Sequence, residues 1–404
     1  MTDYDIIIAG GGLVGANLAC ALAGSGLRLA IVEPKHWQDS QRSYDDRSLA
    51  LGYGSRRIFE GIGLWQEISV DAMPIKRIHI SDCGRFGFAR LDASDAGIDA
   101  LGYVLEVPAL GKVLYRALQK SDAIDLFCPA AVTGLALEHD AARVDLQQAG
   151  AHKAITARLI VGADGGRSRV REIVGIGAHT TDYGQNAVVA NVTPGRRHNH
   201  IAYERFTESG PLALLPMRDN RFTVVWSARR EHVDTILRWD DYKFLQELQR
   251  RFGDRLGEFK NVGRRTSYPL SLTRVNVHIR ARITLIGNAA HVVHPVAGQG
   301  FNLGLRDVAV LSEVIADAAR AGRDIGDLAV LAQYSKLRRT DTYAVTLFTD
   351  GLIRIFANAL TPLAIARNIG LIVTDLLPPV KRALIRRTSG LAGSQPRLAR
   401  GPPL

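Results

Sequence analysis

The sequence predicts an α/β fold, because apolar runs of the buried-strand type alternate with glycine turns and helical patterns. Residues 4–9 form such a run, and a glycine turn and a helical pattern lead to a second run at residues 27–32. Residues 282–286 form another short β-type run, which a glycine-containing loop joins to a helical stretch. Continuous apolar strands are typical of a parallel sheet covered on both faces. We therefore expect a Rossmann-like domain, and the strand-like runs within residues 185–228 predict an inserted second sheet.

The first glycine turn has the spacing of a dinucleotide-binding motif. Gly10, Gly12 and Gly15 follow the run at residues 4–9, and the next run ends in Glu33, 18 residues after Gly15. Glycines at this spacing allow a tight turn and the close approach of a pyrophosphate, and the acidic residue binds ribose hydroxyls. The unit predicts one bound dinucleotide, but the motif alone does not choose between FAD and NAD.

Residues 281–307, ARITLIGNAAHVVHPVAGQGFNLGLRD, predict a second ligand-binding loop. A β-type run precedes a loop with Pro295, Gly298 and Gly300, and helix-forming residues begin at Leu303. Backbone N–H groups and the helix dipole at such a helix start favour an electron-rich or anionic group. An ordinary strand, turn and helix is the alternative interpretation.

The composition is that of a globular protein and excludes several classes. With 404 residues, 47% hydrophobic and 23% charged, the chain can bury one large core or two coupled cores. Cys20, Cys83 and Cys128 include no CxxC pair, which indicates a reducing compartment and neither a disulfide framework nor a zinc site. Residues 6–27 carry no charge, but their six glycines and the acidic residues before them argue against a signal peptide or a membrane span.

Positive charge is concentrated at the C-terminal end. The net charge is +11, and residues 351–404 contain eight Lys and Arg against one acidic residue, Asp375. No nucleic-acid-binding motif accompanies this charge, so nucleic acid is a poor candidate as partner. In residues 349–387, apolar stretches alternate with basic ones. This pattern predicts either contact with anionic lipid or a helix docked on the protein's own core or on a partner.

Residues 281–307 resemble the second flavin-binding motif of the single-component aromatic hydroxylases that carry FAD. The likeness is strongest to the ubiquinone-biosynthesis branch, the 2-polyprenyl-6-methoxyphenol hydroxylase-like proteins. RSYDDRSLAL (residues 42–51), ARLIVGADGGRSRV (157–170) and TDGLIRIFAN (349–358) resemble the same branch, so the likeness extends over nearly the whole chain. It implies a Rossmann-like FAD-binding domain, an inserted β-sheet substrate domain of the aromatic-hydroxylase type and a helical C-terminal segment.

The resemblance also implies domain boundaries. The expected parts are an FAD-binding domain (residues 1–74, 104–180 and 275–345), a substrate domain (75–103 and 181–274) and a C-terminal helical segment (346–387). Residues 388–404 are rich in Gly, Pro and Ser, and we expect them to be disordered.

Single residues take roles from the same resemblance. Asn288 stands where the family usually has an Asp that holds the ribityl chain, so its uncharged amide implies a change in flavin affinity or potential. A solvated loop arginine is the alternative for Arg47, and a plain turn is the alternative for Asp164. The implied FAD-binding residues are Gly10, Gly12, Gly15, Glu33, Arg47, Asp164, Gly287, Asn288, Pro295, Gly298, Gly300 and Asn302.

Two further groups of residues are candidates on the substrate side. GPLALLPM resembles the strand that covers the reacting face of the flavin, so Leu214, Leu215 and Pro216 are expected to line the substrate cavity, with core packing as the alternative. His291 and His294 are candidates to assist deprotonation of a phenol, with a packed role as the alternative. No other catalytic residue and no metal ligand is assigned.

The implied reaction is hydroxylation of an aromatic ring. FAD stays tightly but non-covalently bound, NADPH or NADH reduces it transiently, and O2 supplies the oxygen atom. The implied substrate is a lipophilic polyprenylphenol of ubiquinone biosynthesis. We therefore expect a cytoplasmic protein that is peripheral on the inner face of the cytoplasmic membrane and has other ubiquinone-biosynthesis proteins as partners. The alternatives are a reductase or halogenase on the same fold, or a non-catalytic scaffold subunit.

Overall fold

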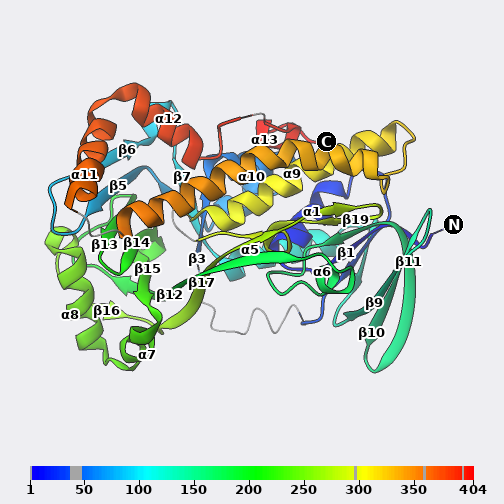
Figure 1. Cartoon of the computed structure of the whole chain (residues 1–404), viewed down its shortest axis with the longest axis horizontal. Coiled ribbons are helices and arrows are strands. Elements are labelled where there is room, and N and C mark those ends of the chain that lie inside the picture. Colours follow the sequence, from blue (N-terminus) through cyan, green and yellow to red (C-terminus); the bar gives the residue numbers. More distant parts are fainter. Residues whose placement is uncertain (1, 37–47, 295–297, 358–360, 394) are drawn as a thin grey trace.

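The chain folds into two large sheets and a set of long C-terminal helices (Figure 1). This computed structural model describes residues 2–36, 48–294, 298–357, 361–393 and 395–404. The N-terminal motif lies in one sheet, and the apolar strands near residue 210 lie in the other. The helices that follow residue 298 run from the first sheet to the second (Figure 1).

The first sheet contains the expected parallel βαβ unit. The central strand β1 (Tyr4–Ala9) pairs in parallel with β2 (Leu29–Val32) and with β11 (Ala151–Gly162). Ile6 and Ile8 face a core beneath helix α1, whereas Ile7 faces a second core, and all three are 0% exposed. Burial on both faces explains why this strand is a continuous apolar run. The other strands are β8 (Ile124–Phe127), β9 (Ala131–Leu137), β10 (Ala142–Gln148), β18 (Ile279–Arg280) and β19 (Ile283–Leu285).

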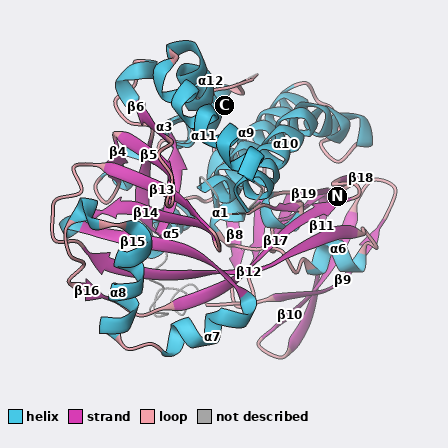
Figure 2. Cartoon of the chain, turned by 60° about the vertical axis from the view of Figure 1, so that its left-hand side comes forward, coloured by secondary structure: helices cyan, strands magenta, loops and turns pink. Residues whose placement is uncertain are grey.

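The second sheet is largely antiparallel and separates two groups of helices. Helices α7 (Arg230–Arg238) and α8 (Asp241–Phe252) cover one face, while the C-terminal helices lie on the other (Figure 2). Its strands, in order across the sheet, are β20 (His291–Val292), β17 (Thr266–Val275), β12 (Ala178–Thr193), β15 (Arg221–Arg229), β14 (Gly210–Met217), β13 (Ile201–Thr207), β5 (Arg77–Asp82) and β6 (Phe88–Asp92), with β16 (Asn261–Val262) beside β12.

A small third sheet and several helices join the two large sheets. The small sheet contains β3 (Ser48–Gly52), β7 (Gly102–Glu106) and β4 (Met73–Ile75). Besides α7 and α8, the described helices up to the first long C-terminal one are α1 (Leu13–Leu22), α3 (Tyr53–Ile62), α4 (Trp65–Ser69), α5 (Val107–Gln119), α6 (Arg169–Ile173) and α9 (Gln299–Arg320). Short 3-10 turns lie at Ala93–Ala96, Arg218–Asn220, Asp254–Leu256 and Gly287–Ala289.

The C-terminal segment is helical and packs back on the second sheet. Helix α10 (Leu328–Ala357) runs beside α9, and α11 (Thr361–Leu376) packs on β6. Helix α12 (Pro378–Thr388) follows, and its Ile385 is buried against Leu91 and Leu101. Within the described ranges, no helix combines the length and the apolar character that a crossing of the bilayer needs.

The expectation of disorder after residue 388 is wrong for the residues that the structure describes there. Helix α13 (Arg397–Arg400) packs against α3, and Leu398 is 1% exposed. Arg397 forms ion pairs with Glu313 at 3.2 Å and with Asp317 at 2.6 Å, both on α9. The composition was misleading because one buried leucine and two ion pairs are enough to hold a short polar segment in place.

Candidate functional site

The glycine turn of the first motif, residues 10–15, packs main-chain atoms tightly against one another. Gly10 has φ +104°, and a Cβ on it would lie 2.5 Å from the carbonyl oxygen of Ala163. A Cβ on Gly15 would lie 2.0 Å from the carbonyl oxygen of Gly10, so only glycine lets α1 begin this close to β1. The strand end, the turn and the helix start are thereby fixed by close main-chain contacts, one within the motif and one to Ala163.

The ligand side of the first motif is open. A Cβ on Gly12, the residue that precedes α1, would meet nothing within 4 Å. Glu33 follows β2, and its carboxylate accepts hydrogen bonds from the N–H groups of Gly11 at 2.8 Å and Lys35 at 3.0 Å. Each carboxylate oxygen retains a free lone pair, so Glu33 can still accept hydrogen bonds from ribose hydroxyls.

Asp164 lies directly beside the first motif. Its Cα would be 2.8 Å from a Cβ on Gly10, although the two residues are far apart in sequence. One carboxylate oxygen accepts the N–H of Val170 at 3.0 Å, and the other, Oδ1, is buried and has no hydrogen-bond partner among the described residues. A buried carboxylate oxygen without a partner is costly, so it indicates a place for a ligand donor.

The second predicted ligand-binding loop, within residues 281–307, reaches the same place from a later part of the chain. β19 leads to Gly287, and a Cβ on Gly287 would lie 3.1 Å from the side chain of Val14 on α1. Asn288 is exposed in this loop, and Gly300 has room around it. Gly298 has φ +61° and lies against Ala50 of β3. The structure thus brings the glycines of both motifs, Glu33, Asp164 and Asn288 to one region.

Asn302 serves the protein rather than a ligand. Its Oδ1 accepts hydrogen bonds from Gly52 N at 2.8 Å and Ser55 Oγ at 2.6 Å, and its Nδ2 donates to Ala50 O and Gly298 O. Its amide hydrogen-bonding capacity is taken by these contacts. The prediction of direct cofactor contact therefore does not hold for the Asn302 amide, which fixes the loop at Gly298 to β3.

A buried ionic cluster supports the same loop, and sequence reasoning missed it. Asp307 of α9 is 1% exposed and accepts hydrogen bonds from Gly287 N at 2.9 Å and Arg338 Nε at 2.7 Å. His291 Nε2 lies 2.7 Å from Oδ2 of this carboxylate, the oxygen that also accepts the Gly287 N–H, whereas Arg338 donates to Oδ1. Burial acts to raise the pKa of Asp307, but His291 and Arg338 outweigh it and hold that pKa well below its usual range. A charged residue on an otherwise apolar helix face was the available signal.

Neither histidine candidate lies in the cavity wall. His291 is 5% exposed and is engaged by Asp307, and His294 is 1% exposed and packs edge-on against Tyr183. Burial lowers the pKa of His294 to about 4, so its ring is neutral at pH 7. The packed, loop-stabilising interpretation describes both residues. Two other predicted residues, Arg47 and Pro295, lie outside the described residues.

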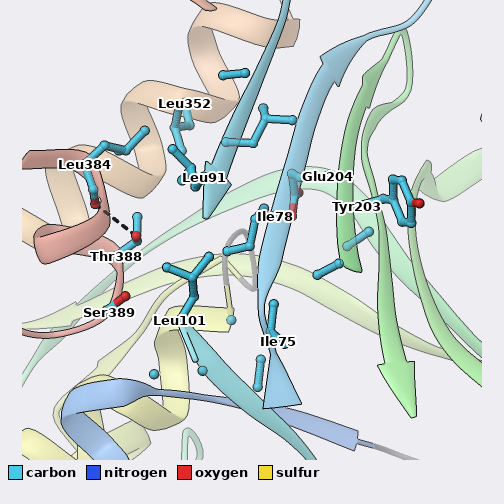
Figure 3. A pocket seen from close by; sticks show the side chains of 18 of the residues that line it. Ile75, Ile78, Leu91, Leu101, Tyr203, Glu204, Leu352, Leu384, Thr388 and Ser389 are labelled. Atoms are coloured by element: carbon cyan, nitrogen blue, oxygen red, sulfur yellow. Dashed lines mark hydrogen bonds between the residues drawn. The ribbon is translucent and has the colours of Figure 1, made fainter. Parts of the chain in front are cut away.

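A cavity of about 330 Å³ begins at the second predicted ligand-binding loop and extends between the second sheet and the C-terminal helices. Gly298, Asn302 and Gly52 line one end, and apolar residues of β5, β13, β14, α10 and α11 line the rest. Figure 3 shows Ile78, Leu91, Leu101 and Leu352 around this space, with Leu384 and Thr388 of α12 at its side. The C-terminal segment is therefore part of the cavity wall.

The expected cavity residues divide between the two faces of β14. Leu215 lines the cavity together with Ala213. Leu214 is 0% exposed and packs with Trp226 and Phe244 in the core on the other face. Pro216 is buried and is not among the lining residues. Side chains alternate along a strand, so consecutive residues cannot all face one cavity, and the expectation was wrong for Leu214 and Pro216.

Comparison with known proteins identifies the family. Residues 3–349 match the family described as FAD binding domain. The chain belongs to the FAD-binding domain family. Ubiquinone hydroxylase UbiL of Rhodospirillum rubrum is 40% identical, covering 99% of this chain and 93% of the relative. The 3-demethoxyubiquinol 3-hydroxylase of Escherichia coli is 30% identical, covering 96% and 98%. These FAD-family relatives align along nearly their whole lengths, so the likeness includes the C-terminal helices.

Solved structures confirm the fold of this FAD-binding protein. The p-nitrophenol 4-monooxygenase of Pseudomonas putida superposes with a TM-score of 0.80 at 18% identity, covering 96% of this chain and 99% of that one. The OxyS anhydrotetracycline hydroxylase of Streptomyces rimosus gives a TM-score of 0.73 at 22% identity, covering 97% and 77%. The Rossmann-like aromatic-hydroxylase fold is confirmed, and the chain is an FAD-dependent monooxygenase.

The described residues fit FAD. The open space at Gly12 suits a pyrophosphate, Glu33 suits a ribose, and the unpartnered Oδ1 of Asp164 suits a hydroxyl donor. The exposed amide of Asn288 can accept and donate hydrogen bonds where the family usually has a carboxylate. The cofactor contacts of these single residues stay predictions.

Proposed function

We propose that the protein hydroxylates the aromatic ring of a polyprenylated phenol in ubiquinone biosynthesis, using NADPH or NADH and O2. Bound FAD supplies the redox chemistry and the activation of oxygen. The residues of the chain hold the cofactor, orient the ring in the cavity and keep water from the reacting atoms. Two hydroxylase relatives with ubiquinone or demethoxyubiquinol in their names support this substrate class.

The observation that carries the proposal is the position of the apolar cavity. It starts at Gly298 and Asn302, where the second predicted ligand-binding loop meets the cofactor region, and continues towards α11. An aromatic ring at the first end would lie against the proposed flavin position, and a prenyl chain would extend along leucine and isoleucine side chains. Such a lining favours a lipophilic substrate over a small polar acid.

We also propose that α11 rests on an anionic membrane surface. Arg367, Gly370, Leu371 and Thr374 line the cavity, whereas Ile365, Ile369, Val373 and Leu376 form a separate stripe on α11 and are 39% to 69% exposed. Arg382, Arg386 and Arg387 are exposed on the adjacent α12. An exposed apolar stripe beside basic residues suits a lipid surface, and it lies across one helix from the cavity.

The deciding experiment uses the purified full-length protein loaded with FAD. Anaerobic addition of NADPH or NADH should bleach the flavin faster with a short-chain prenylphenol present, and admission of O2 should yield the hydroxylated phenol. A protein that holds FAD and oxidises NAD(P)H, but converts none of a panel of prenylphenols, would overturn the proposed substrate. A protein that does not retain FAD would favour the scaffold alternative.

A further inference from the structure

The apolar cavity contains one carboxylate without a protein partner, Glu204 of β13. Among the described residues that line it, only Glu204 and Arg367 have a carboxyl or guanidinium side chain. Arg367 of α11 is engaged by Asp82 of β5, with Nε 2.7 Å from the carboxylate oxygen. Glu204 forms no hydrogen bond or ion pair within the described part of the chain, and burial alone perturbs it.

The strand register directs the Glu204 side chain into the cavity. Glu204 lies opposite Ala213 on β14 and opposite Ile80 on β5, and both of these residues line the cavity. Ala202 and Phe206, two residues away on β13, line it as well, which places all three side chains on one face. Figure 3 shows the Glu204 carboxylate beside the strand that carries Ile78, among apolar side chains.

The surroundings make this carboxyl group sensitive to a ligand. Burial raises the pKa of Glu204 to about 7, so both protonation states are accessible near neutral pH. The described residues of β14, α10 and α12 that line the cavity are uncharged, and Arg367 of α11, which also lines it, pairs with Asp82 of β5. A desolvated carboxylate without a donor is unfavourable, and a hydroxyl group on a ligand would satisfy it.

We propose that Glu204 accepts a hydrogen bond from the ring hydroxyl of the substrate and so fixes the orientation of the ring. The inference rests on the proposed function for the identification of the ligand as a phenol. During oxygen transfer the O–H bond breaks, its proton moves to the carboxylate, and its electron pair stays on the ring oxygen. The ring becomes more electron-rich, and the carboxyl group returns the proton when the ring hydroxyl of the product re-forms.

The test compares a prenylphenol with its methyl ether, which has no hydroxyl proton. Binding to the FAD-loaded full chain is followed by the change in flavin absorbance, and turnover by product formation between pH 5.5 and 8.5, a range chosen to span a pKa of about 7. The variants are Glu204→Gln, Glu204→Leu and, as the matched control, Glu208→Gln, because Glu208 is exposed in the turn after β13. Equal FAD content establishes that each variant is folded.

The wild type and Glu208→Gln should prefer the phenol to the ether, and their turnover should rise as pH passes about 7. Glu204→Leu should lose the preference, with about a tenfold weaker phenol affinity, and Glu204→Gln should lose the pH-dependent rise. An unchanged phenol-to-ether ratio in Glu204→Leu, or an unchanged pH profile in Glu204→Gln, overturns the inference while product formation upholds the proposed function. Weaker phenol binding by Glu204→Leu, with no product from the wild type, supports the inference and overturns the proposed function.

Discussion

The cofactor region and the cavity are built in opposite ways. In the cofactor region, three segments that are far apart in sequence meet through backbone contacts, as where Gly15 lies against Gly10 and Gly10 against Ala163. In the cavity, side chains from β5, β13, β14, α10, α11 and α12 meet across an apolar space. The first construction leaves no room for a side chain at Gly10 or Gly15, whereas the second can accept new side chains and change what it binds.

The largest effect is expected from a side chain added to the first motif. In Gly15→Val, the Cβ would lie 2.0 Å from the Gly10 carbonyl oxygen, so α1 must move away from β1 and the cofactor should be lost. Gly111→Ala on α5 is the control, because a Cβ there meets nothing within 4 Å. The measurement is the FAD-to-protein ratio after gel filtration. A Gly15→Val protein with full FAD content would show that the motif is less constrained than described.

The buried Asp307 cluster should contribute most to stability in the cofactor region. Asp307→Asn leaves Arg338 and His291 without their shared carboxylate, and removal of one partner of a buried ion pair costs about 3–5 kcal/mol. Urea unfolding measures this loss, with Asp234→Asn on α7 as the control, because that aspartate is exposed and about 0–1 kcal/mol is expected there. A loss below about 1 kcal/mol in Asp307→Asn would contradict a supporting role of the cluster.

The same cluster predicts a dependence of stability on pH. The folded-state pKa of Asp307 lies below its ordinary value of 3.8, so the ionised carboxylate stabilises the protein above that pH. The contribution should fade as the pH drops below 3.8 towards the folded-state pKa, and Asp307→Asn should lack this part of the acid sensitivity. Unfolding free energies of the two proteins between pH 3 and 7 give the comparison, and parallel curves would contradict it.

Two adjacent residues of β14 face opposite sides of the second sheet. Ala213 lines the cavity, and Leu214 packs in the core on the other face. Ala213→Leu places a larger side chain in the cavity and leaves less room for the substrate. It should lower kcat/KM for a long-chain prenylphenol by about tenfold, with little change in FAD content. Leu214→Ala removes a core side chain and should cost about 2–5 kcal/mol of unfolding free energy, with substrate preference retained. Reversed outcomes for the pair would mean that β14 presents its other face to the substrate.

Sequence reasoning succeeded where function depends on local backbone geometry. The glycine turn at Gly10, the strand run of β1 and the acidic end of β2 are each encoded within a few residues, and the structure assembles them as expected. Remote contacts were not accessible in the same way. Nothing near Asp307 in sequence indicates that it reaches the N–H of Gly287 and the guanidinium of Arg338.

The cavity shows the same limit more strongly. GPLALLPM indicated the correct strand. Which residues face the cavity depends on which face of the sheet α7 and α8 cover, and this places Leu215 in the cavity wall and Leu214 in the core beneath those helices. Glu204 gave no signal at all, because a glutamate within a strand is usually solvent-facing and only the packing of α10 and α11 encloses it. Placement of α11 over the second sheet rests on Asn368 and Asp375, which bind the N–H groups of Gly87 and Arg90.

The smallest effect concerns the outer stripe of α11. Ile365→Ser combined with Ile369→Ser should weaken binding to vesicles that contain anionic lipid, because each isoleucine withdrawn from lipid loses about 1 kcal/mol. Tyr242→Ser on α8 is the control, since that tyrosine is 76% exposed and α8 covers the face of the second sheet opposite the C-terminal helices (Figure 2). Co-sedimentation at low and high salt separates the apolar contribution from that of the arginines on α12. Two results together would contradict the proposed role of the apolar stripe: the double variant sediments with the vesicles as well as the wild type does, and high salt releases the wild type. In that case basic residues alone hold the protein on the membrane.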